Sequence, residues 1–359
     1  MEQSAEHRLW QSSMDGDVET VRSLLAPGSA VDVNLVLGDR LDTPLHRACR
    51  FGRTAVAKAL LGDPRVEVNK LNIFGCTPFF ISCQEGSTDI VEMLLADPRV
   101  DVTWPHKEGH EPFFMACQEG CQDVVRLLLA DPRIDVNKVT PKGATPFFIA
   151  CWKGTIEIVR MLLRDHRVDV TRPMKDGCTP FYVACAQNGS SRDLVELLLA
   201  DPRTDPAIPS AEKTSPFLVA CEGGDAEVIG VLLSEPRIDV NLPTATGHSP
   251  LWFASQNGYL PVVQFLLSSD REVDTGMKSQ THEKKTAAEQ ARWAAGQHDR
   301  WAHIVRDDPD RRSRYCPLIV ELITAYESGP AEVRLRLRRE PGVRGFSPPS
   351  SFSPSSSAG

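Results

Sequence analysis

The chain has 359 residues, of which 41% are hydrophobic and 25% are charged, and its formal net charge at pH 7 is −8. A chain with a sequence pI near 5.7 lacks the general positive surface that attracts nucleic acids and anionic membranes. The first eight residues are polar, and no run approaches the roughly 18 apolar residues of a membrane-spanning helix. We therefore expect a soluble intracellular protein, cytoplasmic or nuclear, without a nucleic-acid partner or membrane insertion.

A repeated string dominates the chain from residue 43 onward. A Thr-Pro or similar pair is followed six residues later by a small residue, usually Cys, and shortly afterwards by Gly. The strings begin at Thr43, Thr77, Glu111, Thr145, Thr179, Ser215 and Ser249, and each starts 34 residues after the previous one except Ser215, which follows by 36. A fixed period of this length is typical of repeat proteins.

Residues 145–165 show what one repeat predicts. Thr145 is a favourable N-cap and Pro146 suits the first helical position, so a helix should begin there. Gly154 can adopt the left-handed conformation that ends the helix, and residues 158–163 carry a second apolar set at helical spacing. Two helices this short cannot bury their apolar faces alone, so neighbouring repeats must stack into one continuous core.

These features resemble the ankyrin repeat. Thr43 to His46 spell the TPLH string of that family, and the short helix pair, Gly turn, Asp-Val-Asn string and hairpin tip recur in the same order. The resemblance implies an all-α, ankyrin-repeat solenoid of stacked helix-turn-helix units with hairpin-like loops. The family's His is mostly Phe here, as in Phe80, Phe114 and Phe148, which predicts an aromatic packing column.

The resemblance divides the chain into five segments. Residues 1–38 are expected to form a degenerate amino-terminal capping repeat, and residues 39–275 seven ankyrin-like repeats. Residues 276–328 are expected to form a degenerate carboxyl-terminal cap with a charged insertion. Residues 329–345 are an Arg-rich segment, and residues 346–359 form a Ser/Pro-rich tail that should be disordered.

Two local features need a separate interpretation. The sixth repeat has two additional residues near 188–191, which we expect in the turn between its helices. The Arg cluster at 334–339 fits either a solvated helix docked on an acidic body or an arm for nuclear targeting or partner binding.

Asp-Pro-Arg strings end most of the second helices, as at residues 97–99 and 131–133. Pro cannot continue a helix, so we interpret the strings as stop signals. The alternative is a column of Arg side chains that binds acidic groups, but every Arg has an Asp or Glu two positions away.

Ten cysteines occur in the chain, and six occupy the same repeat position: Cys49, Cys83, Cys117, Cys151, Cys185 and Cys221. Neighbouring helices pack about 8 to 10 Å apart, beyond the roughly 7 Å between Cα atoms that a disulfide allows. We therefore expect reduced core residues at these six positions. Cys76 and Cys178 directly precede Thr at hairpin tips and are predicted to be exposed thiols.

No motif indicates catalysis. The chain has no Gly-rich phosphate loop, the HExxH-like string at His282 ends in Thr286, and Cys117 and Cys121 lack further zinc ligands nearby. The remaining candidate histidines are scattered over the repeats: His46, His106, His110 and His248. We therefore expect no enzyme activity, no cofactor and no metal site.

The resemblance implies that a partner meets the hairpin tips and the exposed end of each first helix, which together line a concave groove. These positions vary between repeats, whereas the helix spine does not. The candidate partner-binding residues are Phe51, Phe74, Gln84, Glu85, Lys107, Glu108, His110, Gln118, Glu119, Lys142, Trp152, Lys153, Lys175, Asp176, Gln256 and Asn257. We expect one or more protein partners and a monomeric protein.

Trp152 is the leading candidate for an anchor. Equivalent positions hold Gln84, Gln118 and Gln256, so stacking of the repeats does not require an aromatic side chain there. Exposed aromatics beside charged residues are typical of interface hot spots. The alternative is local packing of Trp152 against Gln118 or Gln187, and Trp104 is a second candidate.

Three asparagines form a candidate modification site: Asn69, Asn137 and Asn241. Each ends an L-x5-[DE]-V-N string, which looks like the string that asparaginyl hydroxylases accept in ankyrin repeats. A structural role as a hairpin-turn residue is the stronger interpretation and does not exclude modification.

The function predicted from these features is that of an intracellular adaptor or scaffold that binds proteins. The alternative is a substrate-recognition subunit of a ubiquitin ligase or another enzyme complex, with the carboxyl-terminal cap as its docking arm. A third reading is an enzyme whose site the motif search missed.

Overall fold

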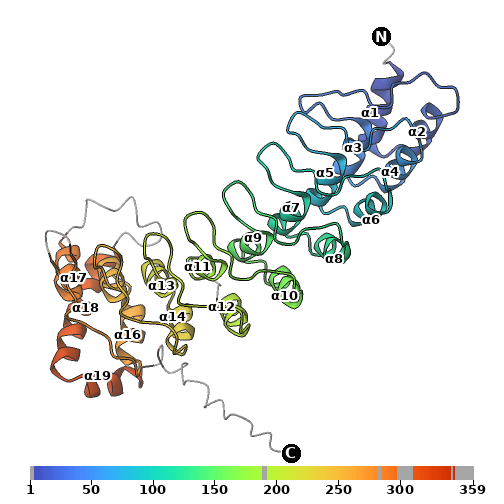
Figure 1. Ribbon diagram of the computed structural model, residues 1–359. Helices are drawn as coiled ribbons and strands as arrows, with labels where there is room; N and C mark the ends of the chain where they lie inside the picture. Colours follow the sequence, from blue (N-terminus) through green and yellow to red (C-terminus); the bar gives the residue numbers. More distant parts are fainter. Residues whose placement is uncertain (1–3, 188–191, 281–283, 297–309, 341–342, 344–359) are drawn as a thin grey trace, which may run out of the picture. The chain divides into compact units, whose positions relative to one another are not determined.

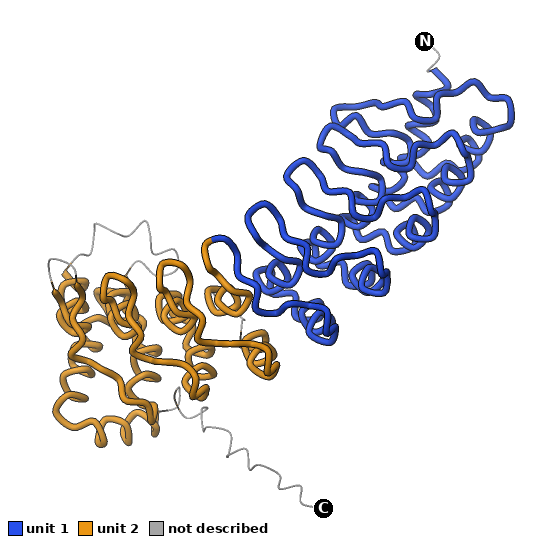
Figure 2. Tube along the Cα trace, viewed as in Figure 1, with its two compact units in different colours: residues 1–175 blue, residues 176–359 orange. Residues whose placement is uncertain are grey.

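The computed structural model describes residues 4–187, 192–280, 284–296, 310–340 and 343. In these residues it contains helices, no strand, and one isolated bridge between Leu37 and Asp42, so the all-α prediction is confirmed. The chain divides into two compact units, residues 1–175 and 176–359 (Figure 2). The insertion expected near 188–191 and the tail expected at 346–359 lie outside the described residues.

The first unit is a series of helix pairs. They are α1 (Ala5–Asp15) and α2 (Val18–Leu24), α3 (Pro44–Arg50) and α4 (Thr54–Leu61), α5 (Pro78–Glu85) and α6 (Thr88–Ala96), α7 (Pro112–Glu119) and α8 (Gln122–Ala130), and α9 (Pro146–Lys153) and α10 (Ile156–Arg164). First helices pack on first helices, as α5 does on α7, and second helices pack on second helices. In Figure 1 the long hairpin loops of this unit project on the side of the first helices.

The second unit continues the same pattern and then departs from it. Its helices are α11 (Pro180–Cys185), α12 (Arg192–Leu199), α13 (Pro216–Gly223), α14 (Ala226–Leu233), α15 (Pro250–Asn257), α16 (Leu260–Ser268), α17 (Ala287–Ala295), α18 (Arg311–Ser328) and α19 (Pro330–Leu337). Helix α17 packs against α15 and α18, and α19 packs against α16 and α18. The last three helices therefore cover the end of the stack.

The first helices begin and end as their sequences predict. The Thr145 hydroxyl accepts the backbone N–H of Phe148 at 3.0 Å, Pro146 fills the first helical position, and Gly154 follows with a φ of +69°. Glu111 is the exception, because its side chain forms no capping hydrogen bond at the start of α7. Burial raises the pKa of Glu111, and its carboxylate lies 3.4 Å from the Lys138 ammonium.

The six equivalent cysteines are buried and reduced, as predicted. Burial raises the pKa of the Cys49 thiol to about 12, which keeps it protonated and unreactive. The prediction of an exposed thiol at Cys76 is wrong, since only 7% of this residue is exposed. Its N–H donates to the Asn72 side chain at 3.0 Å and its carbonyl accepts from His46 at 3.0 Å, so the hairpin folds the thiol inward. Cys178 is half-buried.

The Asp-Pro-Arg strings of the first unit join two repeats as well as ending a helix. The Arg99 guanidinium pairs with Asp97 at 2.7 Å and also donates to the Leu61 carbonyl of the preceding repeat at 2.8 Å. The arrangement recurs in the next repeat, where Arg133 donates to the Leu95 carbonyl at 2.9 Å. The pairing of Arg with the nearby Asp is confirmed, and the bond between repeats is an additional role that the sequence did not reveal.

The asparagine of each Asp-Val-Asn string also bridges two repeats. Asn137 donates to the Arg167 carbonyl at 2.6 Å and accepts the Asp169 N–H at 2.8 Å. Asn69 and Asn241 make the same pair of bonds to the repeats that follow them. We call these arginine and asparagine bonds the inter-repeat clasp.

The Arg-rich segment docks on the second unit through two of its arginines. Arg334 donates to the Arg271 carbonyl at 3.2 Å and to the Tyr326 hydroxyl at 2.7 Å. Arg338 donates to the Ser268 carbonyl at 2.9 Å and pairs with Asp270. These contacts support the interpretation of a docked helix for α19.

Candidate functional site

Five of the hairpin tips are five-residue turns held by the same bond. The side chain of the first residue accepts the backbone N–H of the fifth. Examples are Asn72 with Cys76 at 3.0 Å, His106 with His110 at 3.2 Å, Thr140 with Ala144 at 3.1 Å, Ser210 with Thr214 at 3.3 Å and Thr244 with His248 at 3.2 Å. This bond fixes the turn without the middle side chains Phe74 and Lys142. In the tip at residues 174–178 the middle residue Asp176 instead accepts the Cys178 N–H at 3.0 Å.

Backbone hydrogen bonds join neighbouring tips. In the first unit Ile73 donates to the Arg40 carbonyl at 2.9 Å, Lys107 to the Phe74 carbonyl at 3.1 Å, and Lys175 to the Lys142 carbonyl at 3.2 Å. In the second unit Ala211 donates to the Asp176 carbonyl at 2.9 Å and Gln280 to the Thr246 carbonyl at 2.8 Å. The joined tips are therefore ordered relative to one another rather than independent loops.

The predicted partner-binding residues are accessible to different degrees. Exposed ones are Phe51, Phe74, Glu85, Lys107, Glu108, Glu119, Lys142, Trp152, Lys153, Lys175 and Asp176. Half-buried ones are Gln84, His110, Gln118, Gln256 and Asn257. Asn257 is engaged within the fold, because its amide donates to the Glu222 carbonyl and its oxygen accepts from Arg312, each at 3.2 Å.

Trp152 lies in the last turn of α9 and is 59% exposed, the highest value among the exposed large hydrophobic residues of the described chain. The adjacent Lys153 is also exposed. The exposure of Trp152 fits its predicted role as an anchor, and Trp104 is 43% exposed as well.

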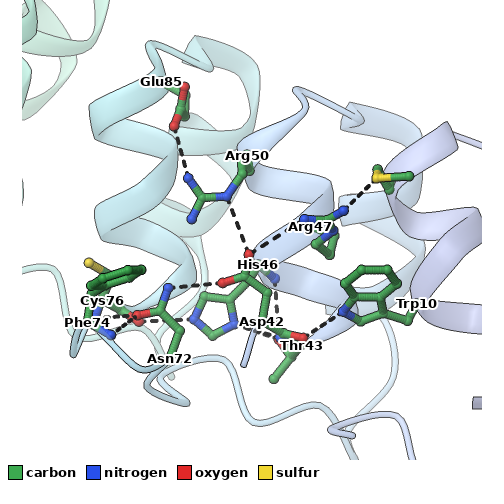
Figure 3. A network of polar contacts seen from close by, with 11 residues as sticks. Trp10, Asp42, Thr43, His46, Arg47, Arg50, Asn72, Phe74, Cys76 and Glu85 are labelled. Atoms are coloured by element: carbon green, nitrogen blue, oxygen red, sulfur yellow. Dashed lines mark hydrogen bonds and ion pairs between the residues drawn. The ribbon is translucent and has the colours of Figure 1, made fainter. Parts of the chain in front are cut away.

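The start of α3 holds a buried polar network (Figure 3). The Asp42 carboxylate accepts from the Asn72 amide at 3.0 Å and lies 3.4 Å from the Arg50 guanidinium. His46 accepts the Thr43 N–H through Nδ1 at 3.2 Å and donates from Nε2 to the Cys76 carbonyl. Burial lowers the pKa of His46 to about 4, so the ring is neutral at physiological pH.

The network reaches the exposed surface through two arginines. Arg50 extends from Asp42 to the Glu85 carboxylate, 3.2 Å away on the next first helix. The Arg47 guanidinium lies over the rings of Trp10 and Phe51, 4.2 and 4.9 Å from their centroids. The network therefore fixes the position of Glu85 and Phe51, two of the predicted partner-binding residues.

The structure brings together two histidines that the sequence analysis treated as scattered. The ligand atoms of His106, Glu108 and His110 lie within 4.8 Å of one another at one tip. The rings of His106 and His110 continue an aromatic stack between Phe80 and Phe114, with centroid separations of 5.1, 4.8 and 4.8 Å. The predicted aromatic column is thus present here, with imidazole rings inserted into it.

The same geometry argues against metal ligation at this tip. His106 Nδ1 accepts the His110 N–H, which leaves the ring proton of a neutral His106 on Nε2. A cation there requires that proton to leave or the turn to open. His106 also occupies the turn position that Asn72 and Thr140 fill in other repeats, so the turn accounts for it.

The candidate hydroxylation sites all lie in the inter-repeat clasp and are half-buried. Both polar atoms of the Asn137 side chain are engaged by the next repeat, which confirms its structural role. Hydroxylation stays a prediction. Intact-mass analysis of protein isolated from its own cells would detect the added oxygen.

A family model that describes three copies of the ankyrin repeat matches four overlapping ranges of the chain. These are residues 9–105, 64–140, 113–206 and 181–278, and together they cover most of the chain. The chain belongs to the ankyrin repeat family. A comparison with curated proteins found no match. Ankyrin repeats are generally protein–protein interaction modules and generally non-catalytic. In the described part of this ankyrin repeat protein, no helix is long and apolar enough to cross a membrane.

Proposed function

We propose that this ankyrin repeat protein binds one or more proteins as an intracellular adaptor or scaffold, without catalysing a reaction. In this proposal residues 39–275 bind the partner, residues 1–38 and 276–328 cap the stack, and the protein acts as a monomer. The binding face consists of the hairpin tips and the carboxyl-terminal ends of the first helices.

One observation carries the proposal: the tips have a uniform backbone and unlike side chains. The middle residue of successive tips in the first unit is Arg40, Phe74, Glu108 and Lys142, and all four are exposed. A row whose spacing is fixed while its chemistry varies suits recognition of a specific partner. A rigid, pre-formed surface also loses little conformational entropy on binding.

Trp152 is the proposed anchor of this face because of its exposure at the end of α9. Large aromatic side chains at the centre of an interface commonly cost about 2 kcal/mol or more of binding free energy when truncated. Lys142 and Lys175 are exposed on neighbouring tips of the same unit, so the surroundings favour a partner surface with acidic groups.

The test places a photo-crosslinking amino acid at position 153 in protein expressed in its native cells. Crosslinked proteins are then identified by mass spectrometry. We expect one dominant partner that is lost in the Trp152→Ala background and retained with Lys58→Ala, an exposed change on α4 of the same unit, away from the tips. If the same proteins crosslink with and without Trp152, position 153 does not report an interface.

An alternative function is a substrate-recognition subunit of a ubiquitin ligase or another enzyme complex. Leu318 on α18 and Leu335 on α19 are 44% and 55% exposed, which favours a docking role for the carboxyl-terminal helices. In that case catalytic subunits should co-purify with the protein and be lost in the Leu318→Ser, Leu335→Ser variant. Retention of those subunits by the variant would remove this alternative.

A further inference from the structure

An exposed apolar cluster lies on the tips of the second and third repeats. Leu41, Leu71, Ile73 and Phe74 are 44%, 40%, 42% and 49% exposed. The two tips are joined by the hydrogen bond from the Ile73 N–H to the Arg40 carbonyl. We call these four side chains together with Arg40 the amino-terminal tip patch.

Leu41 is held in a backbone conformation that leucine normally avoids. Its φ is +53°, in the left-handed region. The equivalent tip residue 34 positions later in each of the next repeats is glycine, with φ of +74° at Gly75, +79° at Gly109 and +89° at Gly143. A left-handed leucine is strained, and strain of this kind is found where a side chain serves a function.

Stacking of the repeats does not require Leu41, because the next three tips stack with glycine in its place and the tip of another repeat stacks with Lys213. The patch around it is also unlike the remaining tips of the first unit. Where the third repeat has Ile73 and Phe74, the fourth has Lys107 and Glu108. Four exposed apolar side chains on one pair of tips therefore indicate a contact with something outside the repeat stack.

The charge next to the cluster is positive. The Arg40 guanidinium lies over the Phe74 ring, 5.6 Å from its centroid, and Arg40 is exposed. Among the described residues no carboxylate lies within ion-pair distance of Arg40. Residues 37–58 contain five arginines and lysines and only two acidic residues, in a chain whose net charge is −8. One of those two, Asp42, is buried and already paired with Arg50.

We propose that the amino-terminal tip patch docks an extended acidic segment of another protein, in which a large aliphatic or aromatic side chain lies next to an Asp or Glu. The apolar side chain packs on Leu41, Ile73 and Phe74, and the carboxylate pairs with Arg40. This inference rests on the proposed function. It places a contact of defined chemistry on the second and third repeats, separate from Trp152.

The experiment pans a display library of random 12-residue peptides on the full-length protein and measures the affinity of the enriched peptides by titration. We expect enriched peptides to combine Leu, Ile or an aromatic residue with neighbouring Asp or Glu. The test variants are Leu41→Asn, which removes the apolar side chain with a residue that tolerates positive φ, and Arg40→Glu, which reverses the charge. The matched control is Lys213→Asn, because Lys213 has a φ of +60° at the equivalent tip position of another repeat.

Leu41→Asn and Arg40→Glu should each weaken peptide binding at least about tenfold, a step equivalent to 1.4 kcal/mol. Lys213→Asn and Trp152→Ala should leave peptide binding unchanged. A peptide with Lys in place of its acidic residue should regain affinity for the Arg40→Glu variant. Equal thermal unfolding midpoints for the parent protein and the Leu41→Asn variant would show that the fold is intact.

Three results would overturn the proposal. Enriched peptides that lack acidic residues, or no enrichment at all, would show that the patch does not recognise this chemistry. Peptides that lose binding with Trp152→Ala but keep it with Leu41→Asn would leave the proposed function standing and reject the patch. A concentration-dependent dimer in sedimentation equilibrium that Leu41→Asn dissociates would assign the patch to a second copy of the chain.

Discussion

The inter-repeat clasp and the hairpin tips form two edges of each repeat, and they follow opposite rules. In the clasp both side chain and bond are repeated: Arg99 and Arg133 bond to carbonyls in the preceding repeat, and Asn69 and Asn137 to the following one. At the tips the bonds are repeated in the backbone, while the outer side chains change from Phe74 to Glu108. Constancy at one edge and variation at the other separates the residues that hold the stack from those that are available to a partner.

The second repeat is the exception at the tip edge, because Asp42 at its tip and His46 in α3 form a buried network with Asn72 and Cys76 of the next tip. In later repeats Phe80, Phe114 and Phe148 replace the histidine. In this repeat, unlike the later ones, a histidine beside the tip therefore contributes to the stability of the fold. Four substitutions test this comparison.

The largest effect is expected from His46→Phe as the pH falls. The unfolded histidine titrates near 6.5, but the folded pKa is about 4, so the unfolded state binds the extra proton first. Stability of the parent protein should therefore decrease from pH 6.5 to pH 4, by about 3 kcal/mol for this group. The variant should lose that decrease in urea unfolding measured at pH 7, 6, 5 and 4.5.

His248→Phe provides the control for this pH dependence. Burial also lowers the pKa of His248, but the residue is only half-buried. Its replacement should therefore change the decrease in stability at low pH less than His46→Phe does. If the free energy of unfolding falls equally with pH in the parent protein and in His46→Phe, protonation of His46 does not cause the loss of stability between pH 6.5 and pH 4.

Asn137→Ala is expected to have the next largest effect. It removes the donor to the Arg167 carbonyl and the acceptor of the Asp169 N–H, so two bonds between repeats are lost at once. A typical hydrogen bond contributes about 0.5 to 1.5 kcal/mol, so we expect a loss of about 1 to 2 kcal/mol in the free energy of unfolding. The measurement is urea denaturation followed by circular dichroism.

The tip residue Lys142 supplies the comparison for Asn137. Lys142→Ala should change the free energy of unfolding by no more than about 0.5 kcal/mol, as exposed substitutions usually do. Equal losses for the two variants would contradict the separation between clasp and tips.

Glu111→Thr should stabilise the protein. Glu111 is the N-cap of α7 without a capping bond, whereas Thr77 and Thr145 cap the equivalent helices on either side. A threonine there gains the bond to the N–H three residues on and removes a carboxyl whose pKa is raised by burial. We expect a gain of about 0.5 to 2 kcal/mol in the free energy of unfolding, the usual range for an N-cap.

The reverse change in the next repeat is the control for Glu111. Thr145→Glu should lower the unfolding midpoint because it removes the bond to the Phe148 N–H. If Glu111→Thr instead destabilises the protein, the ion pair with Lys138 outweighs the missing cap.

The fold was predictable because its determinants are local and repeated. Thr145, Pro146 and Gly154 fix the limits of one helix, and the same residues recur at a constant period. The burial of Cys76 was not predictable, because it depends on a hydrogen bond from His46, 30 residues earlier. The strain at Leu41 likewise becomes visible only when its φ is compared with that of Gly75.

The candidate site was predictable in position rather than in chemistry. The repeat register identified Phe74 and Trp152 as surface positions, and the structure exposes both. The register could not reveal that Asn257 is engaged by Arg312, because Arg312 belongs to α18, outside the repeat pattern. Side-chain contacts made by the irregular end of the chain carry no periodic signal.

The smallest effect on stability is expected from Trp152→Ala. Its exposure means that little apolar area is buried by folding, so the free energy of unfolding should change by no more than about 0.5 kcal/mol. Trp252→Ala is the matched control, since Trp252 is only 8% exposed in the equivalent helix of the second unit and its loss leaves a cavity. Urea denaturation should therefore separate the two variants clearly. A marked loss with Trp152→Ala would make this side chain a packing residue of the stack, and the tip edge would then lose its proposed anchor.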